Sequence, residues 1–346
     1  MPVAAAEDTK RQVIRSEWFR SLSKYEKPSL GKAMLQLVGT FVPFIALWAL
    51  MVTMVQRHLP YWYLLPPLVI TSGLMVRIYI FFHDCTHSSF FASRNANRIV
   101  GTICGILTFT PFDMWRVAHT THHATAEDLD ERGTGDIWTL TIDEYLAAPR
   151  WKQIVYRLFR HPIFLFGVAA PMLFLFVQRY APRSAPKQSR DSVTIANIGL
   201  LALLVLAHFT IGIRTYLMIQ IPAISIAAAF GVWLFYVQHQ YEDVYWARHD
   251  EWDPIRAALD GSSYYKLPKV LQWFSGNIGL HHIHHLRPRI PNYNLQQCYD
   301  EIKELQAVEP LTLRRSMKSL FLALWDEQQQ KMVSFRALRS RRGQMT

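Results

Sequence analysis

Charged residues are scarce in this sequence, and long stretches contain none. Asp, Glu, Lys and Arg make up 18% of the residues, whereas hydrophobic types make up 51%. Uncharged gaps run from Lys32 to Arg57 and on to Arg77, and then from Asp191 to Arg214 and on to Glu242. Each gap has about the 20 residues that a helix needs to cross a bilayer. A buried helix of a soluble protein would be shorter and would carry a polar face, so the gaps argue against a soluble fold.

The gaps predict an all-α integral membrane protein with four transmembrane helices. The spans are expected at about residues 33–56, 61–82, 193–213 and 215–238. Residues 1–32 are then an N-terminal cytoplasmic or interfacial segment, 33–285 the membrane core, and 286–346 a C-terminal cytoplasmic cap.

Acidic residues are outnumbered, and the net charge is +11. This excess could suggest a nucleic-acid partner, but the Lys and Arg residues are placed as the positive-inside rule requires. Residues 1–32 hold seven of them and the 61 residues after His285 hold eleven, whereas Arg57 and Arg214 are the only charges in the two outer turns. We therefore expect no nucleic-acid partner, and a multi-pass protein of a bacterial inner membrane with both termini in the cytoplasm.

Two apolar segments leave alternatives open. Residues 99–112 are too few to cross, so we expect them to dip into the membrane and return, or to lie flat at its surface. Residues 162–178 could just span, but basic residues on both sides favour an interfacial or re-entrant segment.

Amphipathic patterns mark three further segments. An apolar stripe among basic residues (Val13, Ile14, Trp18, Phe19 and Leu22) predicts an interfacial helix. After the last histidine cluster, one helix is predicted at Leu295–Ile302 and another at Leu313–Leu324.

Cysteine is also rare. Cys85, Cys104 and Cys298 are odd in number and far apart, which excludes a disulfide framework and fits a reducing compartment. Cys85 lies between two histidines and could in principle bind metal, but a small buried residue is the favoured interpretation.

Histidine, in contrast, is concentrated in three clusters. They are His83-Asp84-Cys85-Thr86-His87, His119-Thr120-Thr121-His122-His123 and His281-His282-Ile283-His284-His285. Residues three or four apart share a helix face, so in each cluster the histidines at these spacings would point the same way. A lone histidine, such as His58 or His208, is usually a core residue with a satisfied hydrogen bond. Eight at repeated ligand spacing instead indicate a site for two metal ions.

The metal chemistry follows from the residues beside the histidines. Zinc hydrolysis would use a general base, typically in a helical His-Glu-x-x-His motif, but Asp84 stands where that Glu should be. Two irons that activate oxygen beside an apolar channel would use all eight histidines and would account for the membrane. A lipid carbon chain has no acidic proton and no carbonyl to polarise, so attacking it requires an oxidising cofactor.

These motifs resemble the membrane fatty acid desaturases. The resemblance covers roughly residues 35–300 and is closest to the acyl-lipid Δ12/ω-3 branch. It is carried by residues 83–91 (HDCTHSSFF), 115–124 (WRVAHTTHHA) and 276–291, which begin GNIGLH and end at Pro291. The resemblance implies a non-haem centre of two Fe ions, O2 as co-substrate, a fatty acyl lipid substrate among the membrane lipids, and a separate ferredoxin- or cytochrome b5-type electron donor. It also implies that the four transmembrane helices lie under a cytoplasmic helical cap that carries the His-rich dimetal site.

The ligand role carries over to eight histidines: His83, His87, His119, His122, His123, His281, His284 and His285. His239, at the inner end of the fourth span, matches a further ligand of related desaturases. An interfacial histidine bonded to a neighbour explains it about as well. This chain departs from the family pattern at Asp84 and Thr86 in the first cluster and at Phe235, where some members have Asn.

Residues around the ligands have weaker signals. Asp84, Asp128, Asp130 and Asp136 could orient imidazole N–H groups, although solvated loop carboxylates are the favoured interpretation for Asp128 and Asp130. The aromatic residues Trp115, Trp138 and Trp233 could line an acyl tunnel or belong to an aromatic belt at the membrane surface.

Three function classes follow. The first is an O2-dependent desaturase that introduces a cis double bond into a lipid acyl chain, Δ12/ω-6-like. The second is a related di-iron membrane oxygenase, such as a carotenoid ketolase or hydroxylase or an alkane hydroxylase. The third is a non-catalytic, histidine-rich membrane metal protein or receptor.

Overall fold

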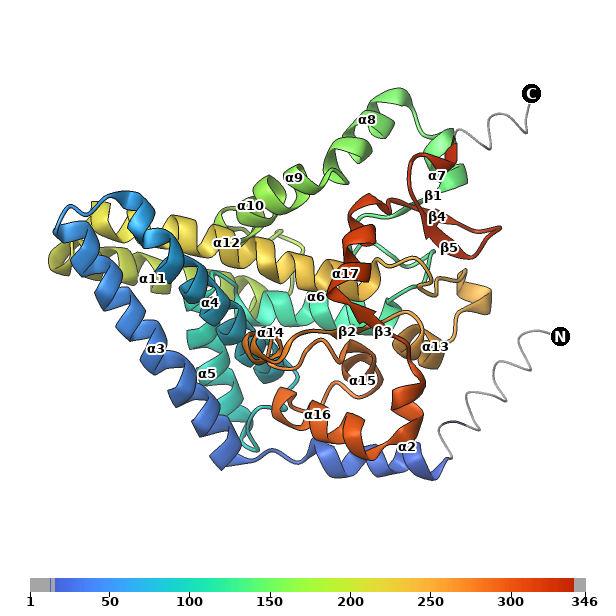
Figure 1. Cartoon of the computed structure of the whole chain (residues 1–346), viewed down its shortest axis with the longest axis horizontal. Helices are drawn as coiled ribbons and strands as arrows, with labels where there is room; N and C mark the ends of the chain where they lie inside the picture. The colour runs from blue at the N-terminus through green and yellow to red at the C-terminus, as the bar shows by residue number, and fades with distance from the viewer. Residues whose placement is uncertain (1–12, 14–15, 339–346) are drawn as a thin grey trace.

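The computed structural model describes Val13 and residues 16–338. It is mostly helical, and its long helices lie at one end while short helices and strands gather at the other (Figure 1). We call the second end the cap: α2 and η1, residues 126–160 and residues 240–338. Ile14 of the predicted interfacial stripe and residues 339–346 of the predicted C-terminal region lie outside the described residues.

Long helices occupy all four predicted spans. They are α3 (Leu30–Gln56), α4 (Leu65–Thr86, preceded by the 3-10 turn η2, Tyr61–Leu64), α11 (Lys187–Thr210) and α12 (Ile213–His239). Their outer surfaces are apolar: Leu35 of α3 is 74% exposed and Phe209 of α11 is 80% exposed. Helices with exposed apolar surfaces are suited to lipid, because every backbone polar group is satisfied within the helix.

A fifth segment, Pro162–Arg179, is also long and apolar enough to cross a membrane. It is not one regular helix. It consists of α9 (Pro162–Phe164), the π-helical turn η3 (Leu165–Ala169), α10 (Ala170–Leu175) and η4 (Val177–Arg179). Length and composition alone allow four or five spans, so the four-span count stays a prediction.

The apolar segment around residues 99–112 forms a helical hairpin. Helix α5 (Arg94–Leu107) packs along α4, and α6 (Phe112–Thr125) then leads back toward the cap. The packing is close: a Cβ at Gly101 would lie 2.2 Å from the Phe112 ring, and one at Gly105 would lie 2.4 Å from the Thr110 carbonyl oxygen. The hairpin has the form expected of a segment that dips in and returns, and it brings the second histidine cluster next to the first.

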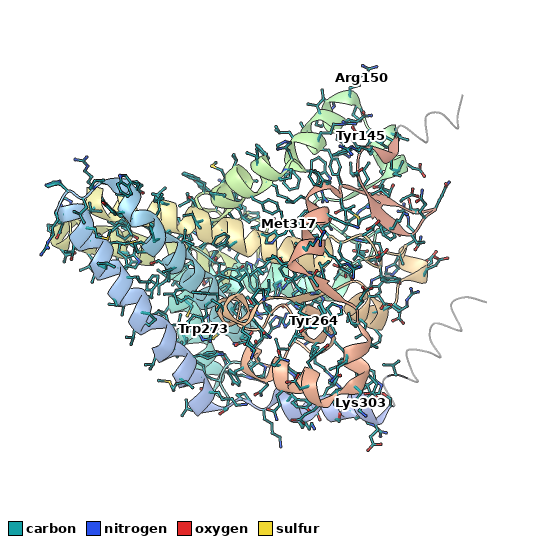
Figure 2. All side chains as sticks on the ribbon, in the orientation of Figure 1. Tyr145, Arg150, Tyr264, Trp273, Lys303 and Met317 are labelled. Carbon is teal, nitrogen blue, oxygen red and sulfur yellow. The ribbon has the colours of Figure 1, made fainter. Side chains whose placement is uncertain are left out.

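The cap contains strands that the sequence did not predict. A three-stranded sheet has the order β1 (Leu140–Thr141), β4 (Leu324–Asp326), β5 (Lys331–Val333), and β2 (Tyr264–Lys266) pairs in parallel with β3 (Pro310–Thr312). The cap is therefore not purely helical. Figure 2 shows Tyr264 inside this end of the molecule and Lys303 at its rim.

Short helices complete the cap. They are α7 (Ile142–Ala147), α8 (Arg150–Phe159), η5 (His249–Glu251), α13 (Pro254–Leu259), α14 (Lys269–Phe274), α15 (His281–Leu286), α16 (Asn292–Glu301), η6 (Lys303–Ala307), α17 (Leu313–Ser316) and η7 (Met317–Phe321). The predicted helix at Leu295–Ile302 corresponds to α16, whose Leu295 and Cys298 are buried. The predicted helix at Leu313–Leu324 is present over most of its length, because α17 and η7 together are helical from Leu313 to Phe321. Only its end differs: Leu324 begins β4, where it pairs with Leu140.

The N-terminal apolar stripe packs against the protein. Phe19 of α2 (Glu17–Ser21) and Leu22 of η1 (Leu22–Glu26) are buried in one core cluster with Leu286 and Leu295. The described part of the stripe therefore supports the elements around the third histidine cluster. This differs from the predicted interfacial helix, because Phe19 and Leu22 pack against other residues of the cap.

Candidate metal centre

Four separate elements carry the predicted histidines to one place. The first cluster lies at the end of α4, the second within α6, and the third within α15, while His239 is the last residue of α12. All four elements end or begin where the helix bundle meets the cap (Figure 1). The helical spacing predicted for each cluster is present, so side chains three or four residues apart face the same space.

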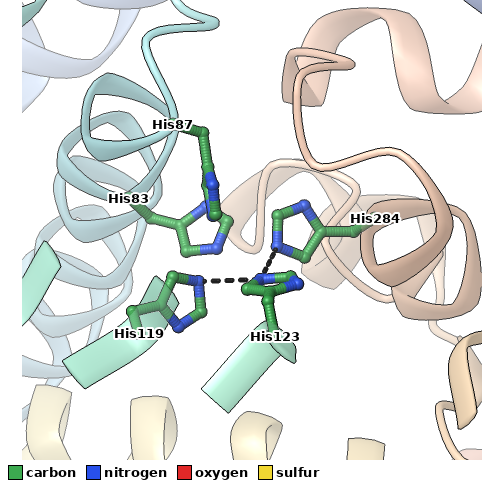
Figure 3. A group of neighbouring side chains, drawn as sticks. All are labelled: His83, His87, His119, His123 and His284. Carbon is green, nitrogen blue, oxygen red and sulfur yellow. Dashed lines mark hydrogen bonds between the residues drawn. The ribbon is translucent and has the colours of Figure 1, made fainter. Parts of the chain in front are cut away.

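The first histidine group contains five residues: His83, His87, His119, His123 and His284. One ring nitrogen of each lies within 4.8 Å of all the others. The Nε2 atom of His123 is 3.1 Å from that of His119 and 3.0 Å from that of His284 (Figure 3). All three clusters therefore contribute to this one group.

The second histidine group contains His122, His239 and His285, with ring nitrogens again within 4.8 Å of one another. The Nε2 atom of His239 lies 3.3 Å from that of His122 and 2.9 Å from that of His281. His281 thus adjoins this group. The two groups touch, because the rings of His123 and His285 stack with their centres 4.2 Å apart.

The spacing of these nitrogens suits a metal ion. When two imidazole nitrogens bind the same metal ion, each at about 2.1 Å, the distance between them depends on the N–metal–N angle. They lie roughly 3.0 Å apart when this angle is about 90° and roughly 3.4 Å apart when it is tetrahedral. The closest pairs here are 2.9 to 3.3 Å apart. The buried Nε2 atoms of His87 and His285 also have no hydrogen-bond partner among the described residues. Imidazole donors of this kind fit iron, zinc and copper.

The environment keeps these imidazoles neutral. Burial, reinforced by the neighbouring histidines, lowers the pKa of His119, His123, His281, His284 and His285 well below the ordinary value. A neutral imidazole has a free lone pair on one ring nitrogen, and metal binding requires that lone pair. These histidines are therefore available to bind metal ions and do not favour a second proton on the ring.

Two predicted carboxylates contact the groups. Oδ1 of Asp84 lies 3.1 Å from Nδ1 of His83, and Oδ1 of Asp136 lies 2.6 Å from Nδ1 of His122. Asp84 also accepts hydrogen bonds from the backbone N–H and the side chain of Asn292, at 2.7 and 2.8 Å, which ties the first cluster to the segment after the third.

The other two predicted carboxylates face elsewhere. Asp128 contacts His249, which belongs to neither group, and Asp130 pairs with Arg248. The structure instead places Glu127 against the second group, with Oε1 2.7 Å from Nδ1 of His239. Sequence reasoning missed this contact, because nothing in the local spacing distinguishes Glu127 from its acidic neighbours.

His282 and Cys85 lie outside both groups. His282 is fully buried and its Nε2–H donates to the Leu305 carbonyl at 3.2 Å. Burial lowers the pKa of His282 to about 4. Cys85 is buried against α5, where a Cβ at Gly101 would lie 2.9 Å from it, as expected for a small packing residue.

The predicted aromatic residues differ in their distance from the site. Trp115 stacks on His119 with ring centres 4.2 Å apart, so it borders the first group. Trp138 instead packs on Tyr156 in the cap, and Trp233 packs on Phe166. Phe235, which replaces the Asn of some desaturases, contacts the rings of both His122 and His239.

Comparison with known proteins agrees with these features. A sequence model of the family described as fatty acid desaturase matches residues 59–315. The chain is 41% identical over 320 residues to a fatty acid desaturase of Bacillus subtilis. The aligned region covers 92% of this chain and 90% of the relative.

More distant relatives have more specific names. An sn-1 oleoyl-lipid 12-desaturase of Picosynechococcus is 26% identical over 251 residues, covering 71% of this chain and 70% of its own length. An sn-1 acyl-lipid omega-3 desaturase (ferredoxin) of Synechocystis is 25% identical over 285 residues, covering 80% and 75%. From the family match and the identity to the Bacillus relative, this chain belongs to the fatty acid desaturases, a family of oxidoreductases.

Proposed function

We propose that this protein introduces a cis double bond into a lipid acyl chain, Δ12/ω-6-like, at a non-haem di-iron centre. The observation that carries the proposal is the convergence of nine buried or partly buried imidazoles into two adjoining groups, where the ends of the apolar helices α4 and α12 meet α6 and α15. The first group would hold one ion, and the second group with His281 would hold the other. Asp84 would orient His83, and Asp136 would orient His122, each by accepting a hydrogen bond from the imidazole Nδ1–H.

Bound iron would supply the oxidation of an unactivated C–H bond by O2, which no side chain can perform. The overall reaction balances when the acyl chain gives up two hydrogens and a separate donor supplies two electrons, with two protons, so that O2 leaves as two waters. The protein's own part is to hold the ions, to bring an acyl chain beside the site and to exclude bulk water. Trp115, stacked on His119, is placed to form part of the wall that an acyl chain would contact.

Substrate and donor are proposed from the relatives' names. One relative is an oleoyl-lipid 12-desaturase, and the name of another specifies ferredoxin. We propose a glycerolipid-linked monounsaturated chain as substrate and a ferredoxin- or cytochrome b5-type protein as electron donor. The active site would face the cytoplasm of a bacterial inner membrane, because Lys and Arg are concentrated at the termini and in the central region.

Product analysis tests the reaction. The full chain is expressed in a host supplied with oxygen and a reductase chain, and fatty acid methyl esters are compared with those of a host carrying the His284→Ala variant. We expect oleoyl chains to be converted to a diene by the wild type only. A new double bond in a saturated chain would overturn the Δ12 assignment, and hydroxylated or ketolated products alone would overturn desaturation.

Reporter fusions test the topology. If the basic flanks fix the orientation, fusions at residues 58 and 214 report the outer side, and fusions at 150 and 185 report the cytoplasm. An outer signal at 185 would make Pro162–Arg179 a true span and would contradict the four-span topology.

A further inference from the structure

Glu127 is the carboxylate in this site that the sequence did not predict, and the structure holds it firmly in place. It follows α6 directly, is 2% exposed, and has a φ of 61°, in the left-handed region that residues with a side chain rarely adopt. The Glu127 carbonyl accepts a hydrogen bond from Ala247 N–H at 3.1 Å, and Asp128 forms a parallel bridge with Ala247. The backbone is thus fixed by a segment far away in the chain.

Space for the Glu127 side chain depends on a glycine. A Cβ at Gly261 would lie 2.7 Å from Cγ and 2.9 Å from Cδ of Glu127, closer than atoms normally approach. A strained backbone and a space reserved by glycine are costs that an ordinary loop carboxylate would not require.

The contact with His239 determines which ring nitrogen of that histidine faces the second group. Oε1 of Glu127 lies 2.7 Å from Nδ1 of His239. When Nδ1 carries the proton and donates it to the carboxylate, the lone pair is on Nε2. That Nε2 atom is the one that lies 2.9 Å from Nε2 of His281 and 3.3 Å from Nε2 of His122. Phe235 packs against the same ring and offers no hydrogen bond, whereas the Glu127 carboxylate and the Gly261 backbone carbonyl both make polar contacts with the ring.

To be ionised at this buried position, Glu127 needs a cation nearby. Its second oxygen, Oε2, is buried without a hydrogen-bond partner among the described residues, and no Lys or Arg in the described part of the chain forms an ion pair with Glu127. A buried carboxylate without compensation is costly, whereas a divalent ion on the far side of the imidazole would offset its charge. The second group then has two carboxylate-bound histidines, His239 and His122, while the first group has one, His83.

We propose that Glu127 is a positioning residue of the second histidine group: it fixes the tautomer and direction of His239 so that Nε2 binds the second metal ion. The proposal rests on the metal centre put forward under Proposed function. Removing the carboxylate should weaken binding at the second group by about 10- to 100-fold, the loss usual when a partner of a metal-bound histidine is removed. Binding at the first group should remain, because the Glu127 side chain bonds to His239 and, within the described part of the chain, to none of the five histidines of the first group.

The experiment is a metal titration of the full-length protein in lipid nanodiscs, stripped and then reloaded with ferrous iron without oxygen. Iron per chain and the two apparent affinities are measured for the wild type and for Glu127→Ala, Glu127→Gln and Glu131→Gln. Glu131 is an exposed carboxylate in the same loop and is the matched control. We expect two tight ions in the wild type and the control, and one tight and one weakened ion in Glu127→Ala. The Gln variant keeps an acceptor but loses the charge, so its weakened site should lie between the two.

The outcomes separate the two proposals. A wild type that binds no iron would refute the metal centre itself. If the wild type binds two ions and both Glu127 variants bind two with unchanged affinity, only the role of Glu127 is refuted. If Glu127→Ala fails to fold, Glu127→Gln decides: unchanged affinities, or equal weakening of both ions, would overturn the proposal.

Discussion

The two histidine groups draw on the sequence clusters in different ways. The first takes residues from all three clusters, whereas the second takes His122 from the second cluster, His285 from the third and His239 from α12, and His281 adjoins it. His122 and His123 are neighbours in sequence and belong to different groups, as do His284 and His285. Neighbours on a helix point about 100° apart, so a histidine pair can serve two adjacent sites at once. The clusters therefore do not correspond one to one with metal ions.

The groups also differ in the charge around them. The first is formed by five imidazoles, of which, among the described residues, only His83 lies within hydrogen-bonding distance of a carboxylate. In the second, two imidazoles contact carboxylates, through Asp136 and Glu127. A carboxylate bound to the outer nitrogen makes an imidazole a stronger donor. The first group therefore depends on the number of its donors, and the second depends more on their orientation and charge.

The largest effect on bound iron and product is expected from replacing either His284 or His285, the adjacent histidines that belong to different groups. His284→Ala should remove the ion of the first group and His285→Ala that of the second, and either change should lower product by more than about 100-fold, since losing even an outer partner costs about 10- to 100-fold. Iron per chain and diene yield measure both effects. The matched control is His208→Ala, at an exposed position far along α11. Loss of the same ion in both variants would contradict the division into two groups.

Removing the charge of Asp84 or Asp136 should have an intermediate effect on iron binding, and each change should affect a different histidine group. Asp136→Asn should weaken the second group's ion by about 10- to 100-fold and leave the first group's ion in place. Asp84→Asn should weaken the first group's ion. Because Asp84 also accepts two hydrogen bonds from Asn292, this variant should lose about 1–3 kcal/mol of unfolding free energy as well.

Iron titration and thermal unfolding of the two aspartate variants, with Asp130→Asn as the exposed control, test this difference. Asp130 pairs with Arg248 at the surface and contacts neither group, so its change should leave both ions bound. Equal weakening of both ions by Asp136→Asn would show that the two sites do not behave separately.

Much of this arrangement could be predicted from the sequence because it is local. The spacing within each cluster determined which histidines share a face, and the uncharged gaps located the four long helices within a few residues of their ends. His239 was identified by its place at the end of a span. Each of these inferences depends on helical period or helix length, which are properties of neighbouring residues.

What the sequence did not reveal depends on distant contacts. Glu127 meets His239 across 112 positions, and no local pattern encodes that meeting. The strands have two or three residues each, too few to show an alternating pattern. Residues from Leu313 to Phe321 are helical, as their period predicts, but Leu324 pairs with Leu140 in a sheet, so long-range packing decided where the helix ends.

His282 provides the smallest expected effect and tests whether helix direction decides membership of the groups. It lies between two cluster histidines but is rotated roughly 100° from His281, and its ring faces Leu305 and Tyr264. His282→Ala should leave both ions bound and most of the diene yield intact. It should still lower the free energy of unfolding by about 1–3 kcal/mol, because the Leu305 carbonyl loses its buried donor. His282→Gln, whose side-chain N–H₂ can reach the same carbonyl, should recover part of that stability. Iron per chain, diene yield and thermal unfolding are measured for both variants beside His284→Ala. If His282→Ala is as inactive and as poor in iron as His284→Ala, then facing away from the groups does not protect a histidine, and the assignment of ligands by helix face is wrong.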